Sequence, residues 1–172
     1  MNTTENLIKA TLCYIMDGPP GHESVLLACK EPTPKAVMFG IANLWNTWGG
    51  ENEEGETVLE TCVRELFAES TLIVDPKDLV EVSRITYDNN GKVKVLVHSF
   101  VATKYKGAPR ESNEMKSPKW YPIRMIPYDQ MCAGDRFVLP VIMSGRKVEG
   151  TIYYNAKREV SLSELRLVTA FD

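Results

Sequence analysis

Residues that bind soft metal ions are scarce in this 172-residue chain, which has four cysteines and two histidines. The cysteines are scattered and form no C-x-x-C pair, which argues against a zinc site. We therefore expect free thiols and a reducing compartment. The residues concerned are Cys13, Cys29, Cys62, Cys132, His22 and His98.

Long apolar runs and an excess of positive charge are also missing. No stretch approaches the length of a membrane span, and no basic segment followed by an apolar run stands at the start. We therefore expect a cytoplasmic protein without a membrane partner. The net charge of −3 gives no reason to expect a nucleic-acid polymer as partner. An anionic small molecule would need positive charge supplied locally, mainly by metal.

Internal repeats, low-complexity runs and linkers are absent as well. The length, with 44% hydrophobic and 25% charged residues, predicts one soluble domain spanning residues 1–172.

The apolar pattern predicts strands separated by a central and a late helix, which indicates α/β layers around a mixed sheet. The late helix should open near Gly134-Asp135 and run to about Ser144, short or kinked because it contains Pro140. The Asn89-Asn90-Gly91 step predicts a hairpin. We expect loops at 31–34 and 106–118, and strands at 7–16, 24–30, 80–88, 92–103, 120–123, 147–154 and 160–169.

The most informative stretch is 49–72, GGENEEGETVLETCVRELFAESTL. Apolar residues recur at helical period over 57–70, which predicts an amphipathic helix. Glu65 and Glu69 share one face of it, where like charges four residues apart cost about 0.2–0.5 kcal/mol. A cation between them would turn this repulsion into ligation, and carboxylates suit Mg²⁺ or Mn²⁺. The alternative is a solvated acidic helix face.

An aromatic stretch precedes this region and contains Phe39, Trp45, Asn46 and Trp48. These side chains could form ordinary core. They could instead hold a flat ligand such as a nucleobase, because aromatic faces stack on bases and an Asn amide both donates and accepts.

At residues 50–72 the chain resembles the Nudix hydrolases, whose box matches at Gly50, Glu56, Arg64, Glu65, Leu66, Glu69 and Leu72. Two positions depart from it: Ala68 replaces the first of two paired glutamates, and Thr71 replaces a glycine. The resemblance implies a Nudix-type α/β/α sandwich around a mixed β-sheet. Because a β-branched residue resists the left-handed conformation of that glycine, we expect Thr71 to have a negative φ.

The similarity extends from Thr11 onward to the mammalian MutT-type members that hydrolyse oxidised purine nucleoside triphosphates, through 44–50, 107–131 and 138–155. It implies a Mg²⁺-dependent pyrophosphohydrolase that yields a nucleoside monophosphate and pyrophosphate. The expected substrate is an oxidised purine nucleotide such as 8-oxo-dGTP, and the expected form is a monomer or homodimer. One alternative is a Nudix enzyme for another nucleotide or a nucleoside diphosphate conjugate. Another, favoured by Ala68, is a weakly catalytic nucleotide-binding module.

The resemblance also assigns roles by position. Glu65 and Glu69 would bind metal, and one glutamate of this set would help to deprotonate the attacking water. Arg64 would pair with Glu56 and brace the loop. The implied metal ligands are the Gly49 carbonyl, Glu65, Glu69 and Glu114, and the implied substrate residues are Phe39, Asn46, Asp135 and Lys35.

Three further departures fall on the implied site. Glu51 replaces a lysine that faces phosphate, Cys132 replaces a base-stacking tryptophan, and Gly134 replaces the first of two aspartates that read the base edge. Glu51 could partly substitute for the ligand lost at Ala68, or it could point to solvent. The changed pocket could shift base discrimination strongly.

Overall fold

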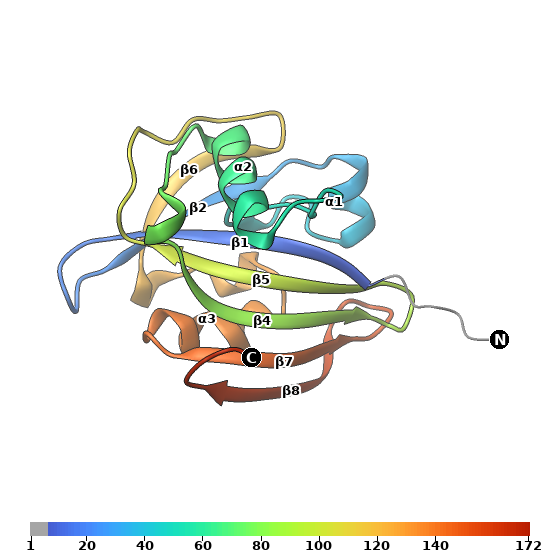
Figure 1. Ribbon diagram of the computed structural model, residues 1–172. Helices are drawn as coiled ribbons and strands as arrows, with labels where there is room; N and C mark the ends of the chain where they lie inside the picture. Colours follow the sequence, from blue (N-terminus) through green and yellow to red (C-terminus); the bar gives the residue numbers. More distant parts are fainter. Residues whose placement is uncertain (1–6) are drawn as a thin grey trace.

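The computed structural model describes residues 7–172; residues 1–6 of the expected domain lie outside this part. Eight strands form one mixed sheet (Figure 1). They are β1 (Leu7–Asp17), β2 (Ser24–Lys30), β3 (Trp45–Asn46), β4 (Val80–Asn89), β5 (Lys94–Ala102), β6 (Met115–Pro122), β7 (Lys147–Tyr154) and β8 (Val160–Val168). The helices are α1 (Pro34–Phe39), α2 (Val58–Ser70) and α3 (Asp135–Met143), with short 3-10 turns η1 (Pro76–Asp78), η2 (Ile123–Met125) and η3 (Tyr128–Gln130).

The strand order is β3-β2-β1-β5-β4-β7-β8, and β6 also pairs with β2. The β1–β5 and β4–β7 pairs are parallel, and the remaining pairs are antiparallel. Strand β1 joins two parts of the sheet, because 7–15 pair with β5 while 16–17 pair with β2. The expected mixed sheet is confirmed, as are the hairpins β4–β5 and β7–β8.

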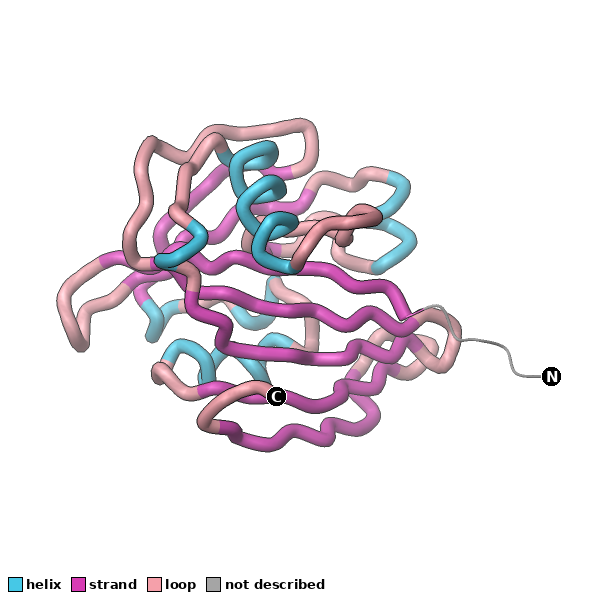
Figure 2. The backbone as a smooth tube through the Cα atoms, in the orientation of Figure 1, coloured by secondary structure: helices cyan, strands magenta, loops and turns pink. Residues whose placement is uncertain are grey.

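Helices lie on both sides of the sheet (Figures 1 and 2). Helix α2 packs against β1, and α3 packs against β4 and β7. Successive side chains of β1 alternate between the two faces, so Cys13 and Ile15 join one apolar cluster while Tyr14 and Met16 join the other. This is the expected α/β/α sandwich. None of the helices in residues 7–172 is long and apolar enough to cross a membrane.

Helix α2 has the predicted position. Thr57 caps its start in a reciprocal capping box with Glu60. Its end differs from expectation, because Thr71 has φ 65° in the left-handed region, so the prediction of a negative φ is wrong. The Thr71 N–H donates to the Phe67 carbonyl at 2.8 Å, and its hydroxyl donates to the Ala108 carbonyl at 3.3 Å. The next residue, Leu72, is fully buried, so packing and these bonds outweigh the local preference.

Helix α1 and the first part of strand β6 differ from the sequence expectation. Helix α1 begins at Pro34, inside the loop predicted at 31–34, with the Thr33 hydroxyl accepting the Ala36 N–H at 3.1 Å. The Thr-Pro step is a usual helix start and carried this signal. Strand β6 begins at Met115, inside the loop predicted at 106–118, because it pairs along β2 despite its polar sequence.

Candidate functional site

The Gly49-Gly50 step lies between β1 and α2. The carbonyls of Trp48 and Gly50 accept backbone hydrogen bonds from β1 at 2.8 and 2.9 Å, whereas no donor within residues 7–172 bonds to the Gly49 carbonyl. A Cβ at Gly49 would lie 1.9 Å from the Thr11 carbonyl oxygen, and one at Gly50 would lie 2.5 Å from the Glu65 carboxylate. Only glycine allows the loop to approach this closely, and it leaves the Gly49 carbonyl free for a ligand.

Glu69 lies beneath this loop at the buried end of α2. Its carboxylate accepts the Gly49 N–H at 3.2 Å and is paired with the Lys30 ammonium at 2.9 Å. The same ammonium lies 2.9 Å from Glu114, at the end of the loop before β6. Lys30 therefore links carboxylates from α2 and from the distant loop at one point beside Gly49.

Burial and charge act against each other in this group. Burial raises the pKa of Glu69, although the Lys30 ammonium partly counteracts it. For Lys30, burial disfavours the charge, but Glu69 and Glu114 outweigh burial and raise its pKa. The hydrogen bond from Lys30 lowers the pKa of Glu114. Lys30 is therefore charged at neutral pH and keeps the site electrically compensated.

Arg64 braces the loop against α2. Its Nε and Nη2 donate to the two carboxylate oxygens of Glu56 at 2.6 and 2.8 Å, and its Nη1 donates to Glu65 at 2.6 Å. A guanidinium fork matches a carboxylate in this bidentate way. The hydrogen bonds from Arg64 lower the pKa of Glu56 to about 2. The expected Arg64–Glu56 contact is thus present, and Glu65 is drawn toward the same arginine.

The donor set is right in kind for a hard divalent cation. It offers carboxylate oxygens of Glu65, Glu69 and Glu114 and the free Gly49 carbonyl, and oxygen donors of this type suit Mg²⁺. The carboxylates are occupied by Lys30 and Arg64, and the described residues contain no ready cluster of three or more acidic, His or Cys ligands. A bound cation would therefore compete with these ion pairs.

Glu51 and Ala68 are two positions at which the chain departs from the family pattern. The Glu51 carboxylate pairs with the Lys35 ammonium at 3.2 Å, and its role as a substitute metal ligand stays a prediction. Lys35 is mostly exposed at the start of α1. Ala68 is exposed on α2.

Asp135, at the first position of α3, is 7% exposed. Burial raises its pKa to about 7, and the Cys132 backbone N–H only partly offsets this. The charge of Asp135 in turn influences several nearby phenols, those of Tyr14, Tyr87, Tyr128 and Tyr154. The result is a buried carboxyl group among several tyrosine side chains.

The other residues implied for the base are partly buried. Phe39 ends α1, and Asn46 lies in β3, where its side-chain oxygen accepts the Thr47 N–H at 2.8 Å. Their convergence with Asp135 on one ligand stays a prediction.

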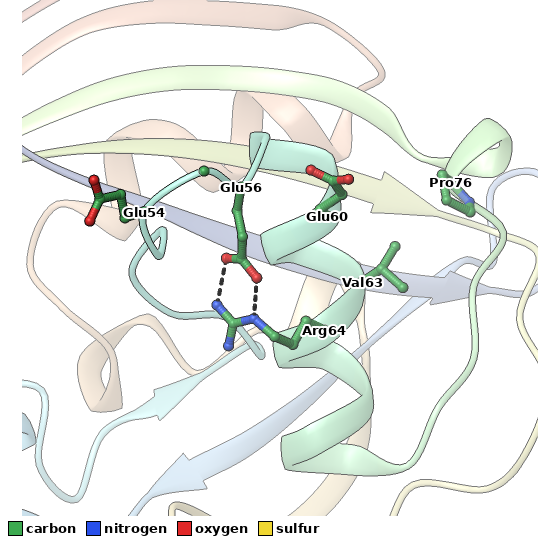
Figure 3. A pocket seen from close by; sticks show the side chains of 7 residues that line it. Glu54, Glu56, Glu60, Val63, Arg64 and Pro76 are labelled. Atoms are coloured by element: carbon green, nitrogen blue, oxygen red, sulfur yellow. Dashed lines mark hydrogen bonds and ion pairs between the residues drawn. The ribbon is translucent and has the colours of Figure 1, made fainter.

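Two open recesses, each about 560 Å³, lie elsewhere. One is beside Glu56 and Arg64 and includes neither Glu65 nor Glu69 (Figure 3). The second is on the outer face of β4, β7 and β8. Neither contains the residues that we expect to bind substrate.

Lys30 is the site residue that the sequence argument missed. It ends the apolar strand SVLLACK, and a lysine is almost never buried unless it is paired. A lysine at the end of a buried strand was therefore the available signal, but its two partners, 39 and 84 residues away, could not be read locally.

Comparison with known proteins covers most of the chain. The NUDIX domain family model matches residues 7–141. An oxidized purine nucleoside triphosphate hydrolase of Danio rerio is 37% identical over 124 residues, 68% of this chain and 78% of that protein. An oxidized purine nucleoside triphosphate hydrolase of Mus musculus is 32% identical over 145 residues, which are 80% of this chain and 91% of that protein. A solved mutator MutT protein from Bacillus halodurans superposes with a TM-score of 0.74 at 26% identity, covering 94% of this chain and 97% of that one.

Proposed function

Because the chain belongs to the NUDIX domain family and is a Nudix hydrolase, we propose that it is a Mg²⁺-dependent nucleoside triphosphate pyrophosphohydrolase. Enzymes of this family generally use divalent metal cations. Water would attack a phosphorus of the triphosphate, and the products would be a nucleoside monophosphate and pyrophosphate. Mn²⁺ could replace Mg²⁺, since both prefer oxygen ligands.

The observation that carries this proposal is the gathering of Glu69 and Glu114 around Lys30, with the Gly49 N–H donating to Glu69. A cation bound there would neutralise charge on the phosphate oxygens. One glutamate of the set Glu65 and Glu69 would help to take a proton from the attacking water. Arg64 would hold the loop in place through Glu56.

The proposed substrate is an oxidised purine nucleotide such as 8-oxo-dGTP. Two relatives at 37% and 32% identity carry the name oxidized purine nucleoside triphosphate hydrolase. Asp135 would bind the edge of the base, with Phe39 and Asn46 lining the pocket and Lys35 near its entrance. The changes at Cys132 and Gly134 make the preference among bases a separate question from the reaction itself.

A weakly catalytic nucleotide-binding module is the second candidate, and one observation favours it. Position 68 carries no carboxylate, and the remaining acids are held in ion pairs with Lys30 and Arg64. This chain would then bind a divalent cation more weakly than a Nudix enzyme that has both paired glutamates.

Pyrophosphate release across a panel of nucleotides with Mg²⁺ tests the proposal. The panel should contain 8-oxo-dGTP, dGTP, dATP and a nucleoside diphosphate conjugate. We expect release of pyrophosphate, fastest from the oxidised purine. Cleavage of the conjugate alone would indicate a different Nudix substrate, and tight nucleotide binding without turnover would indicate the binding module.

A further inference from the structure

Tyr154 of β7 is hydrogen-bonded to the backbone at the start of α3. The Gly134 N–H donates to the Tyr154 hydroxyl oxygen at 3.1 Å. A Cβ built on Gly134 would lie 2.5 Å from that oxygen. The Tyr154 hydroxyl therefore occupies the space into which any side chain at position 134 would extend.

This hydrogen bond leaves the phenolic proton available. A tyrosine hydroxyl has one donor and also accepts, and Gly134 uses only the accepting side. Within residues 7–172 no acceptor takes the Tyr154 proton. Burial raises the pKa of Tyr154 well above its usual range, so the hydroxyl stays protonated at any neutral or mildly basic pH. Tyr154 thus offers a fixed donor.

The adjacent Asp135 offers the complementary group. Its buried carboxyl has a backbone donor at Cys132 but receives no side-chain hydrogen bond from any of residues 7–172, so it can accept a further hydrogen bond. The Tyr87 and Tyr154 rings stack beside it, with centroids 6.3 Å apart and planes 24° apart. A donor and an acceptor therefore border one aromatic surface.

We propose that Tyr154 binds the edge of the base: its hydroxyl donates to an acceptor atom of the base while the Asp135 carboxyl accepts from the neighbouring N–H. This pair of groups would bind a heterocycle edge in which an acceptor adjoins an N–H donor. A guanine-type lactam and an adenine-type amidine both have such an edge. This inference rests on the proposed function, because it presumes a nucleotide in the site.

The test compares Tyr154→Phe with wild type in KM for 8-oxo-dGTP and dATP and in inhibition by inorganic triphosphate, which has no base. Phenylalanine keeps the ring and removes only the hydroxyl. We expect KM to rise about tenfold for the nucleotide whose edge is bound, as for one lost hydrogen bond to a buried group. Inhibition by inorganic triphosphate should be unchanged. Which nucleotide loses affinity identifies the lactam or the amidine edge.

Tyr153→Phe is the matched control on the same strand, because the Tyr153 hydroxyl bonds to Glu164 at 3.0 Å instead of to Gly134. It should leave every KM unchanged. Gly134→Ala provides the second variant, since φ −70° at this position suits alanine. Its Cβ would displace the Tyr154 hydroxyl and raise KM similarly. In the Tyr154→Phe background, Gly134→Ala should add little, because there is no hydroxyl left to displace.

Three results would overturn the inference. The first is a KM of Tyr154→Phe equal to that of wild type for both nucleotides. The second is an equal weakening of inhibition by inorganic triphosphate. The third is a double variant in which the increases in KM caused by Tyr154→Phe and Gly134→Ala simply add. Failure of the proposed function is a different outcome: wild-type protein would then neither bind nor cleave any nucleotide of the panel.

Discussion

The Lys30 ammonium lies 2.9 Å from Glu69 Oε1 and 2.9 Å from Glu114 Oε2, so one buried cation joins two acids from separate elements. Both charges of the Lys30–Glu69 pair are nearly removed from water, with side chains 11% and 7% exposed. In such a pair, loss of one partner leaves an uncompensated charge. Lys30 therefore holds the acidic site together in the absence of any other cation.

Replacing this lysine should destabilise the fold. Lys30→Met leaves Glu69 buried without its counter-charge, and we expect a loss of about 3 kcal/mol in the free energy of unfolding at pH 8. The loss should shrink at pH 5, because Glu69 can then be protonated. Urea unfolding at both pH values measures this.

Lys35→Met is the control for that experiment. It breaks the exposed Lys35–Glu51 pair, and exposed pairs contribute about 0–1 kcal/mol. Equal effects of the two substitutions would contradict the role given to Lys30.

Substitutions of Glu69 and Glu51, two glutamates near the glycine loop, should differ in their effect on the Mg²⁺ dependence of turnover. Glu69→Gln should reduce turnover at least about a hundredfold and raise the Mg²⁺ concentration for half-maximal rate, because a neutral amide holds a hard cation poorly. Glu51→Gln should leave the Mg²⁺ dependence unchanged, since its carboxylate is paired with Lys35. Turnover measured against Mg²⁺ concentration decides this, and a wild-type curve for Glu69→Gln would be incompatible with the site.

The left-handed Thr71 predicts an easy stabilisation. An L-residue with a side chain costs about 1–2 kcal/mol in this conformation, and glycine does not. Thr71→Gly forfeits the 3.3 Å bond to the Ala108 carbonyl and some chain entropy, so we expect a net gain of about 0.5–1 kcal/mol. Thr71→Val, which keeps the branching without the hydroxyl, should destabilise. Thermal unfolding of both variants is the measurement. A Thr71→Gly protein less stable than wild type would show that the left-handed conformation of Thr71 is not strained.

Asp135 predicts a particular pH dependence of stability. Its pKa is about 7 in the folded protein and about 3.9 in the unfolded chain. Between these values the folded protein retains a proton that the unfolded chain has lost, so stability falls as pH rises from 4 to 7, by up to about 4 kcal/mol. Asp135→Asn should remove this fall and be more stable than wild type at pH 8.

The groups around Asp135 do not titrate in that window. Burial raises the pKa values of its neighbours on β1, β4, η3 and β7 and in the preceding turn, which are Tyr14, Tyr87, Tyr128, Tyr154 and Cys132. The charge of Arg158 lowers the pKa of Cys132 but does not offset the effect of its burial. The difference between wild type and Asp135→Asn, measured by urea unfolding from pH 4 to 8, therefore reports this carboxyl, and parallel curves would contradict its raised pKa.

Features set by local pattern were predictable from the sequence. The period of apolar residues in 57–70 indicated α2, and the Asn89-Asn90-Gly91 step indicated the β4–β5 hairpin. The spacing of Glu56 and Arg64 indicated the brace through its resemblance to a known box. These signals lie within a few residues of one another, so the chain displays them directly.

Features set by distant contacts were not predictable in this way. Thr71 adopts a left-handed conformation that a β-branched residue disfavours. The burial of Leu72 and the hydrogen bond to the Ala108 carbonyl, 37 residues away, stabilise it there. Lys30 gained its role only when Glu69 and Glu114 came together. Likewise, Tyr154 reaches Gly134 across the β7–α3 contact, at a separation of 20 residues.

The central claim concerns which bond of a nucleoside triphosphate is broken. ³¹P NMR of 8-oxo-dGTP incubated with wild-type protein and Mg²⁺ measures this directly, with Glu69→Gln as the paired sample. The account predicts nucleoside monophosphate and pyrophosphate in equal amounts from wild type and almost none from Glu69→Gln. Nucleoside diphosphate with inorganic phosphate, or equal product from both proteins, would contradict it.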